Sequence, residues 1–217
     1  MLSCRSSNNK EMKCDKSFCD SCSEISAMLY DEFSFTNDSS YLDSSLFVIN
    51  RALHECSNYE YYVILCMRKL CILSDKREFE SASLFLDSVD LKKRIPVFPY
   101  LQSVYHNRLV AMQYQEAGDM RSKDSCLNLV VEELNGYLTE NKIAIDSMLC
   151  ERNIVSIEKS VIDFPLKQYF YYLTALKGRQ KVDSIIDSIQ QVGDYNQDYI
   201  ETLRDIYDDE FMRFWGI

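Results

Sequence analysis

Apolar residues recur along this chain at spacings of three and four, the period at which one face of an α-helix carries them. The clearest block runs from Tyr41 to Asp90 and predicts three short amphipathic helices separated by polar turns. Because stripes so close in sequence cannot each be buried alone, we expect these helices to stack on one another. Their stripes are Leu42, Leu46, Ile49 and Leu53, then Ile64, Leu65 and Leu70, then Phe79, Ala82, Leu86 and Val89.

The same period continues on both sides of this block. The segment 91–99 contains Pro96 and Pro99 and is predicted to be an extended link, because proline stops a helix. In the helix that follows, the predicted inner side includes one charged residue, Arg108, among apolar ones. Further helices are expected over residues 24–35, 100–117, 122–138, 141–159, 164–176, 182–189 and 199–215.

The scarcity of helix breakers gives the fold class. The 217 residues include 5 Gly and 3 Pro, whereas average usage would give roughly 15 and 11. A β-sandwich or barrel would need many more turn residues, so the sequence predicts an all-α fold of about eight to ten helices in antiparallel pairs. The hydrophobic share of 47% and the charged share of 27% are ordinary for a globular protein, which argues against wholesale disorder.

The charge of the chain narrows its possible partners. The formal net charge is −10 and the sequence pI is about 4.8. Nucleic acids and anionic membranes are therefore disfavoured as direct partners, because binding phosphates requires clustered Lys and Arg. Acidic residues are concentrated between Asp187 and Glu210, where Arg204 is the one basic residue. This segment is interpreted either as a solvated helix face or as a surface for a basic partner.

Residues 1–22 are polar and lack a helical period, so they are predicted to form a flexible leader ahead of a helical domain over residues 23–217. Leu2-Ser3-Cys4 resembles the end of a bacterial lipoprotein signal, in which the Cys is acylated after cleavage. Cys4 is therefore a candidate lipid attachment site. The positively charged and apolar parts of such a signal are missing, so either the start falls inside the signal or the match is accidental.

The cysteines of the leader have a spacing that is worth testing against metal sites. Cys14, Cys19 and Cys22 are arranged as C-x4-C-x2-C, a spacing used by plant-type ferredoxins, and with Cys4 they could also hold zinc. Ferredoxins need a β-rich fold, and Cys4 lies far from Cys14, so no metal and no cofactor are expected. Incidental thiols, or a Cys19–Cys22 disulfide if the protein is exported, are preferred. The five later cysteines are interpreted as small buried apolar residues.

Several residues resemble those of tetratricopeptide repeats in a diverged form. Ser45 and Ala52 stand where that family has small residues in the second helix of a repeat, and Phe79 and Ala82 match its aromatic and small packing residues. Later units resemble the family in Ala111, Tyr114, the Gly118-Asp119 turn and Gly178. Departures are Leu70 and Arg77 in place of glycines and Lys123 in place of a small residue.

The tetratricopeptide resemblance implies a right-handed α-solenoid of stacked helix pairs, closed by C-terminal capping helices. Together with the Leu-Ser-Cys start, the chain is similar to helical-repeat lipoproteins of Bacteroidetes-type bacteria. That similarity implies a location in the cell envelope, either membrane-anchored or periplasmic. A cytoplasmic location is the alternative.

No catalytic signature accompanies this pattern. His54 and His106 lack nearby zinc-ligand spacing, and the sequence has no phosphate-binding loop or nucleophile motif, so we expect no enzyme. The expected function is a scaffold or adaptor that binds a protein segment in a groove between stacked helices. An acidic immunity- or inhibitor-like protein that neutralises a basic partner is the alternative, and a regulatory module that uses the Cys-rich leader is a third. The candidate partner-binding residues are Tyr61, Tyr62, Tyr171 and Tyr172.

Overall fold

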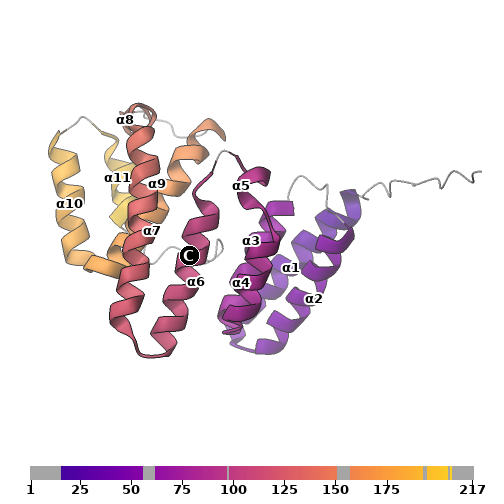
Figure 1. Cartoon of the computed structure of the whole chain (residues 1–217). Coiled ribbons are helices and arrows are strands. Elements are labelled where there is room, and N and C mark those ends of the chain that lie inside the picture. Colours follow the sequence, from indigo (N-terminus) through magenta and orange to yellow (C-terminus); the bar gives the residue numbers. More distant parts are fainter. Residues whose placement is uncertain are drawn as a thin grey trace, which may run out of the picture. The chain divides into compact units, whose positions relative to one another are not determined.

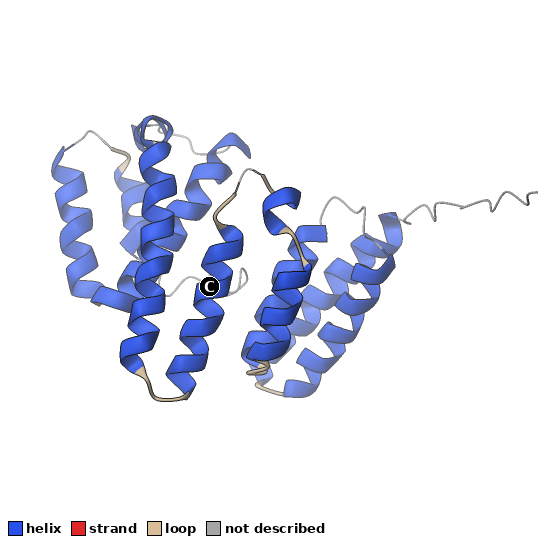
Figure 2. Cartoon of the chain, viewed as in Figure 1, coloured by secondary structure: helices blue, strands red, loops and turns tan. Residues whose placement is uncertain are grey.

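The computed structural model describes residues 16–55, 62–96, 98–150, 157–192, 195–204 and 206. Within these ranges all regular structure is helical and neighbouring helices pack on one another (Figures 1 and 2), which confirms the all-α fold class. The helices are α1 (Lys16–Thr36), α2 (Ser39–Glu55), α3 (Tyr62–Asp75), α4 (Phe79–Ser88), α5 (Leu91–Arg94), α6 (Leu101–Glu116), α7 (Met120–Glu140), α8 (Lys142–Cys150), α9 (Ile157–Lys177), α10 (Arg179–Val192) and α11 (Gln197–Arg204).

Four pairs of consecutive helices among the described residues are joined by turns that share one backbone feature. Each turn contains a residue with positive φ: Asn37 after α1 (57°), Arg77 after α3 (60°), Gly118 after α6 (74°) and Gly178 after α9 (82°). A residue in this left-handed conformation ends a helix by letting the next backbone N–H groups bond back to its last carbonyl groups. The bonds from the N–H of Glu78 to the Leu73 oxygen and from Asp119 to the Tyr114 oxygen are examples, at 2.8 and 2.9 Å.

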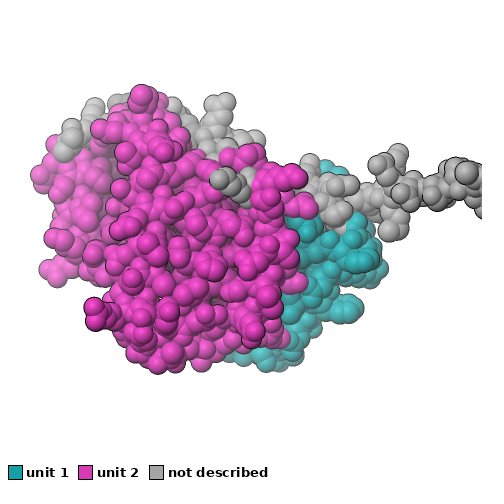
Figure 3. Space-filling view, in the orientation of Figure 1, with its two compact units in different colours: residues 1–66 teal, residues 67–217 magenta. Residues whose placement is uncertain are grey.

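The chain divides into two compact units, Met1–Cys66 and Met67–Ile217, which Figure 3 distinguishes by colour. In the first unit α1 packs along α2. Two small serines, Ser26 and Ser45, are buried where the two helices meet. The Ser45 hydroxyl donates to the Ser26 carbonyl oxygen at 2.9 Å. At the other end of the pair the Arg51 guanidinium lies over the Phe18 ring, 4.8 Å from its centroid.

Residues 16–22, which the sequence analysis assigns to the leader, are helical, because α1 includes Lys16. Cys19 and Cys22 are buried and act as the apolar positions of this first stretch, which its polar neighbours conceal in the sequence. Cys22 is a free thiol whereas Cys19 is disulfide-bonded, so a Cys19–Cys22 disulfide, one of the two alternatives given for these cysteines, is wrong. Residues 1–15, with Cys4 and Cys14, lie outside the described residues, and the predictions made for them stay predictions.

In the second unit α7 is the central helix, since it packs against α6, α8 and α9. The helix α9 packs in turn against α8 and α10, and α10 packs against α11, while α6 also contacts α4 and α5. Large side chains that are fully buried in this unit include Leu86, Leu91, Leu101, Tyr105, Leu109, Leu134 and Ile186.

The link at residues 91–99 is not wholly extended, because Leu91–Arg94 form the helical turn α5. The turn ends before Pro96, so the proline does not interfere with it. Asp90 caps it, its carboxylate accepting a hydrogen bond from the Lys93 N–H at 3.0 Å. Gln102 then ties it down by accepting from the Leu91 N–H at 3.2 Å and donating to the Leu86 oxygen at 2.9 Å.

One helix start towards the C-terminus also differs from the prediction. Of the helix expected over 141–159, α8 covers Lys142–Cys150, and residues 151–156 lie outside the described residues. The helix α9 includes residues from Ile157 and continues through Pro165, although the prediction began it at residue 164. A proline inside a helix removes one backbone hydrogen bond, which the surrounding packing tolerates here. The helix α11 is described as far as Arg204, and the remainder of the predicted 199–215 helix, apart from residue 206, lies outside the described residues.

Candidate functional site

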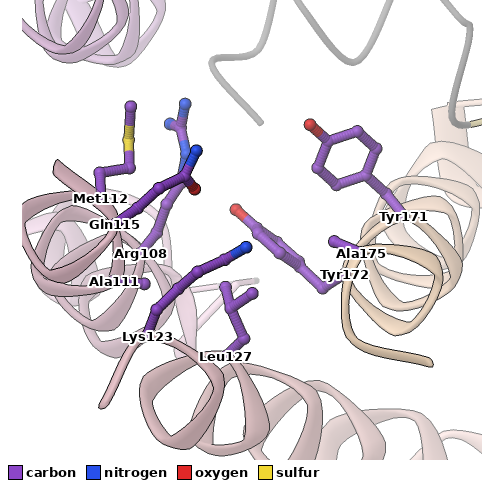
Figure 4. A pocket seen from close by; sticks show the side chains of 9 residues that line it. All are labelled: Arg108, Ala111, Met112, Gln115, Lys123, Leu127, Tyr171, Tyr172 and Ala175. Atoms are coloured by element: carbon purple, nitrogen blue, oxygen red, sulfur yellow. The ribbon is translucent and has the colours of Figure 1, made fainter. Parts of the chain in front are cut away.

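A pocket of about 330 Å³ lies between α6, α7 and α9 in the second unit (Figure 4). Each helix contributes residues at helical spacing, so one stripe of each faces the same space. The walls comprise Arg108, Ala111, Met112 and Gln115 from α6, Lys123 and Leu127 from α7, and Tyr171, Tyr172 and Ala175 from α9. Small side chains at Ala111 and Ala175 leave the space that the longer side chains surround.

Arg108 is the central polar residue of this pocket. Its Nη1 atom is buried and has no hydrogen-bond partner among the described residues, although the residue as a whole keeps some exposure. Burial acts to lower the pKa of Arg108, but the neighbouring Tyr172 and Cys71 groups raise it, and the net pKa is raised. The guanidinium therefore remains a cation with one buried donor that no described residue uses.

Tyr172 provides a second unused donor. The residue is 2% exposed and its hydroxyl has no partner within the part of the chain that the structure describes. Burial raises the pKa of Tyr172, although Arg108 lowers it in part, so the phenol keeps its proton at neutral pH and can donate it in a hydrogen bond. In Figure 4 the hydroxyl of Tyr172 is directed into the space bounded by Gln115, Arg108 and Lys123.

The other groups near Arg108 include an aromatic ring and a thiol, and neither is a nucleophile at neutral pH. The Tyr171 ring meets the Tyr172 ring edge-on, with centroids 5.4 Å apart. Cys71 lies behind the site, and its thiol donates to the Met67 oxygen at 3.0 Å. Burial raises the pKa of the Cys71 thiol to about 12, so it is not a reactive thiolate at neutral pH.

A second pocket in the same unit, of about 470 Å³, has the opposite charge. It lies between α7 and the first part of α6, where Glu132, Glu133 and Glu140 accompany the rings of Tyr100 and Tyr137. The two rings are 4.7 Å apart, and the buried Tyr100 hydroxyl has no partner among the described residues. Carboxylates combined with aromatic faces suit a basic group, by ion pairing and by cation–π contact.

The structure brings together two of the four predicted partner-binding tyrosines. Tyr171 and Tyr172 both line the pocket of Arg108. Tyr62 is half-buried at the start of α3 and belongs to the first unit, so it does not line this pocket, and Tyr61 lies outside the described residues. The two histidines, His54 and His106, are exposed.

Sequence reasoning did not select Arg108, Gln115 or Lys123 as site residues. Two signals were nevertheless present, because Arg108 was a charge on a predicted inner face and Lys123 replaced a small residue of the repeat pattern. Neither signal identifies a site by itself. The pocket exists because α9, distant in sequence, packs against α7.

Within the described ranges no cluster of three or more His, Cys, Asp or Glu has an arrangement suited to a metal ion. In the same part of the chain, no helix combines the length and the apolar character that crossing a membrane requires. No protein-family model, curated protein or solved structure matches this chain.

Proposed function

We propose that this chain is a non-enzymatic scaffold that holds a segment of a partner protein in a groove between stacked helices. The observation that carries the proposal is the pocket between α6, α7 and α9, with its unused buried donors on Arg108 and Tyr172. Arg, Tyr and Met are enriched in the cores of protein interfaces, where they combine apolar area with hydrogen bonding. The same three residue types line this pocket.

We propose further that the helix pairs are diverged tetratricopeptide-like repeats arranged as a solenoid. The left-handed residues at positions 37, 77 and 118 recur at nearly equal intervals and each follow the first helix of a pair. Small residues that the resemblance places between helices are buried: Ser45, Ala52, Ala82 and Ala111. Repeats of this kind stack to form extended concave surfaces suited to binding a chain segment.

Affinity capture from the native host with two matched variants tests the scaffold proposal. Ala175→Trp fills the pocket from an exposed position of α9 and should abolish recovery of a partner that the unmodified chain recovers. Leu84→Trp adds the same side chain at an exposed position of α4 and should leave recovery unchanged. Equal recovery of the partner by both variants would mean that the pocket is not part of the binding site.

An acidic immunity- or inhibitor-like role is the second candidate, and the acidic pocket along α7 favours it. Glu132, Glu133 and Glu140 with two tyrosine rings present a surface suited to a Lys or Arg of a basic partner. Under this alternative, replacing the three glutamates by glutamine should release the captured partner, whereas Ala175→Trp should not. The two variants therefore separate the two candidate functions.

A further inference from the structure

The charge of the Arg108 pocket is opposite to the charge of the whole chain. The chain has 34 Asp and Glu against 24 Lys and Arg, yet among the described residues that line this pocket the charged ones are Arg108 and Lys123, with no carboxylate. Neither Arg108 nor Lys123 forms an ion pair with any residue that the structure describes. Two unpaired cations in one partly buried space are costly unless an anion joins them.

We propose that this pocket is a binding site for a phosphate monoester, whose phosphate is held by Arg108, Lys123 and the hydroxyl of Tyr172. The three groups come from α6, α7 and α9, and Figure 4 shows the ends of Lys123 and Tyr172 directed into one space, with Arg108 and Gln115 on its other side. Guanidinium, ammonium and phenol are donors towards phosphate oxygens, and the guanidinium can bind two of them at once.

The number of cations favours a dianion over a carboxylate. A phosphate monoester carries a charge of about −1.5 to −2 at neutral pH, which matches one guanidinium and one ammonium. A single carboxylate would leave one of the two cations unbalanced. Tyr172 adds to this preference, because a phosphate offers a separate terminal oxygen to each of the three donors, whereas a carboxylate would share its two oxygens among them.

The apolar wall of the pocket favours a phosphate that carries an organic group. Ala111, Met112, Leu127 and Ala175 line the same space of about 330 Å³, which exceeds what a phosphate group alone would fill. An organic group attached to the phosphate would lie against these residues and remove their surface from water. Inorganic phosphate would leave these apolar residues exposed to water, so it should bind more weakly than a monoester.

This inference extends the proposed scaffold function. It rests on that function for the identity of the molecule that carries the phosphate. A phosphorylated Ser, Thr or Tyr of a bound segment would place the phosphate in the pocket and its neighbours along the groove. A free phosphorylated small molecule presents the same chemistry. The shared feature is the monoester group, and the experiment distinguishes the two sources.

Isothermal titration of the full chain tests the site with phenyl phosphate as the probe and with benzoate and inorganic phosphate for comparison. We expect phenyl phosphate to bind, benzoate not to bind measurably, and inorganic phosphate to bind more weakly than phenyl phosphate. Lys123→Gln and Tyr172→Phe should each weaken binding by about tenfold, the loss typical of one hydrogen bond to a charged group. Lys181→Gln, at an exposed position of α10, is the matched control and should bind as the unmodified chain does.

Arg108→Gln should abolish binding, and its circular dichroism melting curve shows whether the fold survives the substitution. Because Lys123→Gln and Tyr172→Phe change single groups at the pocket wall, they keep the test decisive if Arg108→Gln unfolds. Absence of phenyl phosphate binding, equal binding of benzoate, or undiminished binding by both Lys123→Gln and Tyr172→Phe would overturn the proposal.

A library of phosphotyrosine and phosphoserine peptides, with unphosphorylated copies, separates the two sources of the monoester. Tighter binding of selected phosphopeptides than of phenyl phosphate supports both this site and the scaffold function. If phenyl phosphate binds and no phosphopeptide exceeds it, the site stands as one for a small molecule and the scaffold function fails. If no phosphate probe binds but Ala175→Trp still loses the captured partner, this inference fails and the scaffold function stands.

Discussion

Arg77 occupies a backbone conformation that side chains other than glycine adopt at a cost. Its φ is 60°, at the turn where the repeat resemblance has glycine. Its ion pair with Glu116, at 3.1 Å, is solvent-exposed, since 76% of the Arg77 side chain is accessible, and so contributes little. The backbone of this turn, and not the side chain, therefore determines the effect of a substitution here.

We expect Arg77→Gly to raise the free energy of unfolding by about 0.5–1 kcal/mol, since relief of the left-handed strain exceeds the added freedom of the unfolded chain. Urea unfolding measures the change. Arg77→Ala loses the same ion pair but keeps the strain, so it should show no gain. Equal stability of the two variants would contradict this account.

Ala82 shows how closely α4 is packed. The residue is fully buried, in agreement with its predicted position on the apolar stripe. Ala82→Leu should lower the free energy of unfolding by about 1–3 kcal/mol, because the added carbons find no space. Ser81→Leu places the same side chain on the exposed neighbouring position and should change the melting temperature little. A similar loss in both variants would mean that the burial of position 82 is not responsible, since leucine favours a helix more than serine does.

At the scale of elements, a few polar contacts fasten the last described helix. The Tyr199 hydroxyl of α11 donates to the Asp163 carboxylate of α9 at 2.7 Å, and Lys167 pairs with the other carboxylate oxygen at 3.2 Å. Arg204 extends from the same helix to Asp187 of α10 at 2.6 Å. The helix α11 is thus held to both preceding helices by charge-assisted hydrogen bonds.

Tyr199→Phe should lower the free energy of unfolding by about 1.5–3 kcal/mol, the range for a hydrogen bond to a charged acceptor in a protected place. Tyr195→Phe is the matched control, because the Tyr195 hydroxyl reaches Asp146 only at 3.3 Å and should be worth less. Thermal unfolding of the two variants checks the order. If Tyr195→Phe is the more damaging change, the Tyr199 contact does not hold α11.

The cap of α7 should make the stability of this helix depend on pH. Asp119 accepts hydrogen bonds from the Ser122 hydroxyl at 2.6 Å and from the Ser122 N–H at 3.0 Å, and these bonds lower the pKa of Asp119 below 3.8. A lowered pKa in the folded state gives stability that is present above the unfolded-state pKa and lost as the pH falls through the folded-state pKa.

We therefore expect the melting temperature of Asp119→Ala to lie below that of the unmodified chain above about pH 5, with the difference shrinking as the pH falls below 3.8. Asp119→Asn keeps a capping oxygen without a titrating group, so its melting temperature should lack this contribution to the pH dependence. A difference between the unmodified chain and Asp119→Ala that is constant from pH 3 to pH 7 would rule out titration of the cap.

Helices were predictable from this sequence wherever an apolar stripe was long and regular, as in α2, α4 and α7. The start of α1 was missed because its buried positions are cysteines among polar residues, and α5 was missed because Asp90 and Gln102 stabilise a turn too short to show a period. Pro165 lies inside α9, where tertiary packing overrides the local preference.

At the scale of the whole molecule, the candidate site was only half predictable. Tyr171 and Tyr172 could be selected because consecutive aromatic residues must cover more than one face of a helix. Arg108 and Lys123 could not, because their meaning depends on three helices that approach one another only in the folded unit. Residue patterns predict which face of a helix is inward, but not which charges will share one space.

The opposite charges of the pocket and of the chain have a consequence for the speed of capture. At low ionic strength an approaching anion is repelled by the net charge of −10 before it reaches the two pocket cations, since the Debye length is about 30 Å at 0.01 M salt. At about 0.15 M salt that length falls to about 8 Å, which screens the distant acids more than the two cations at contact range. An anionic ligand would therefore associate faster as salt rises, the reverse of ordinary electrostatic steering.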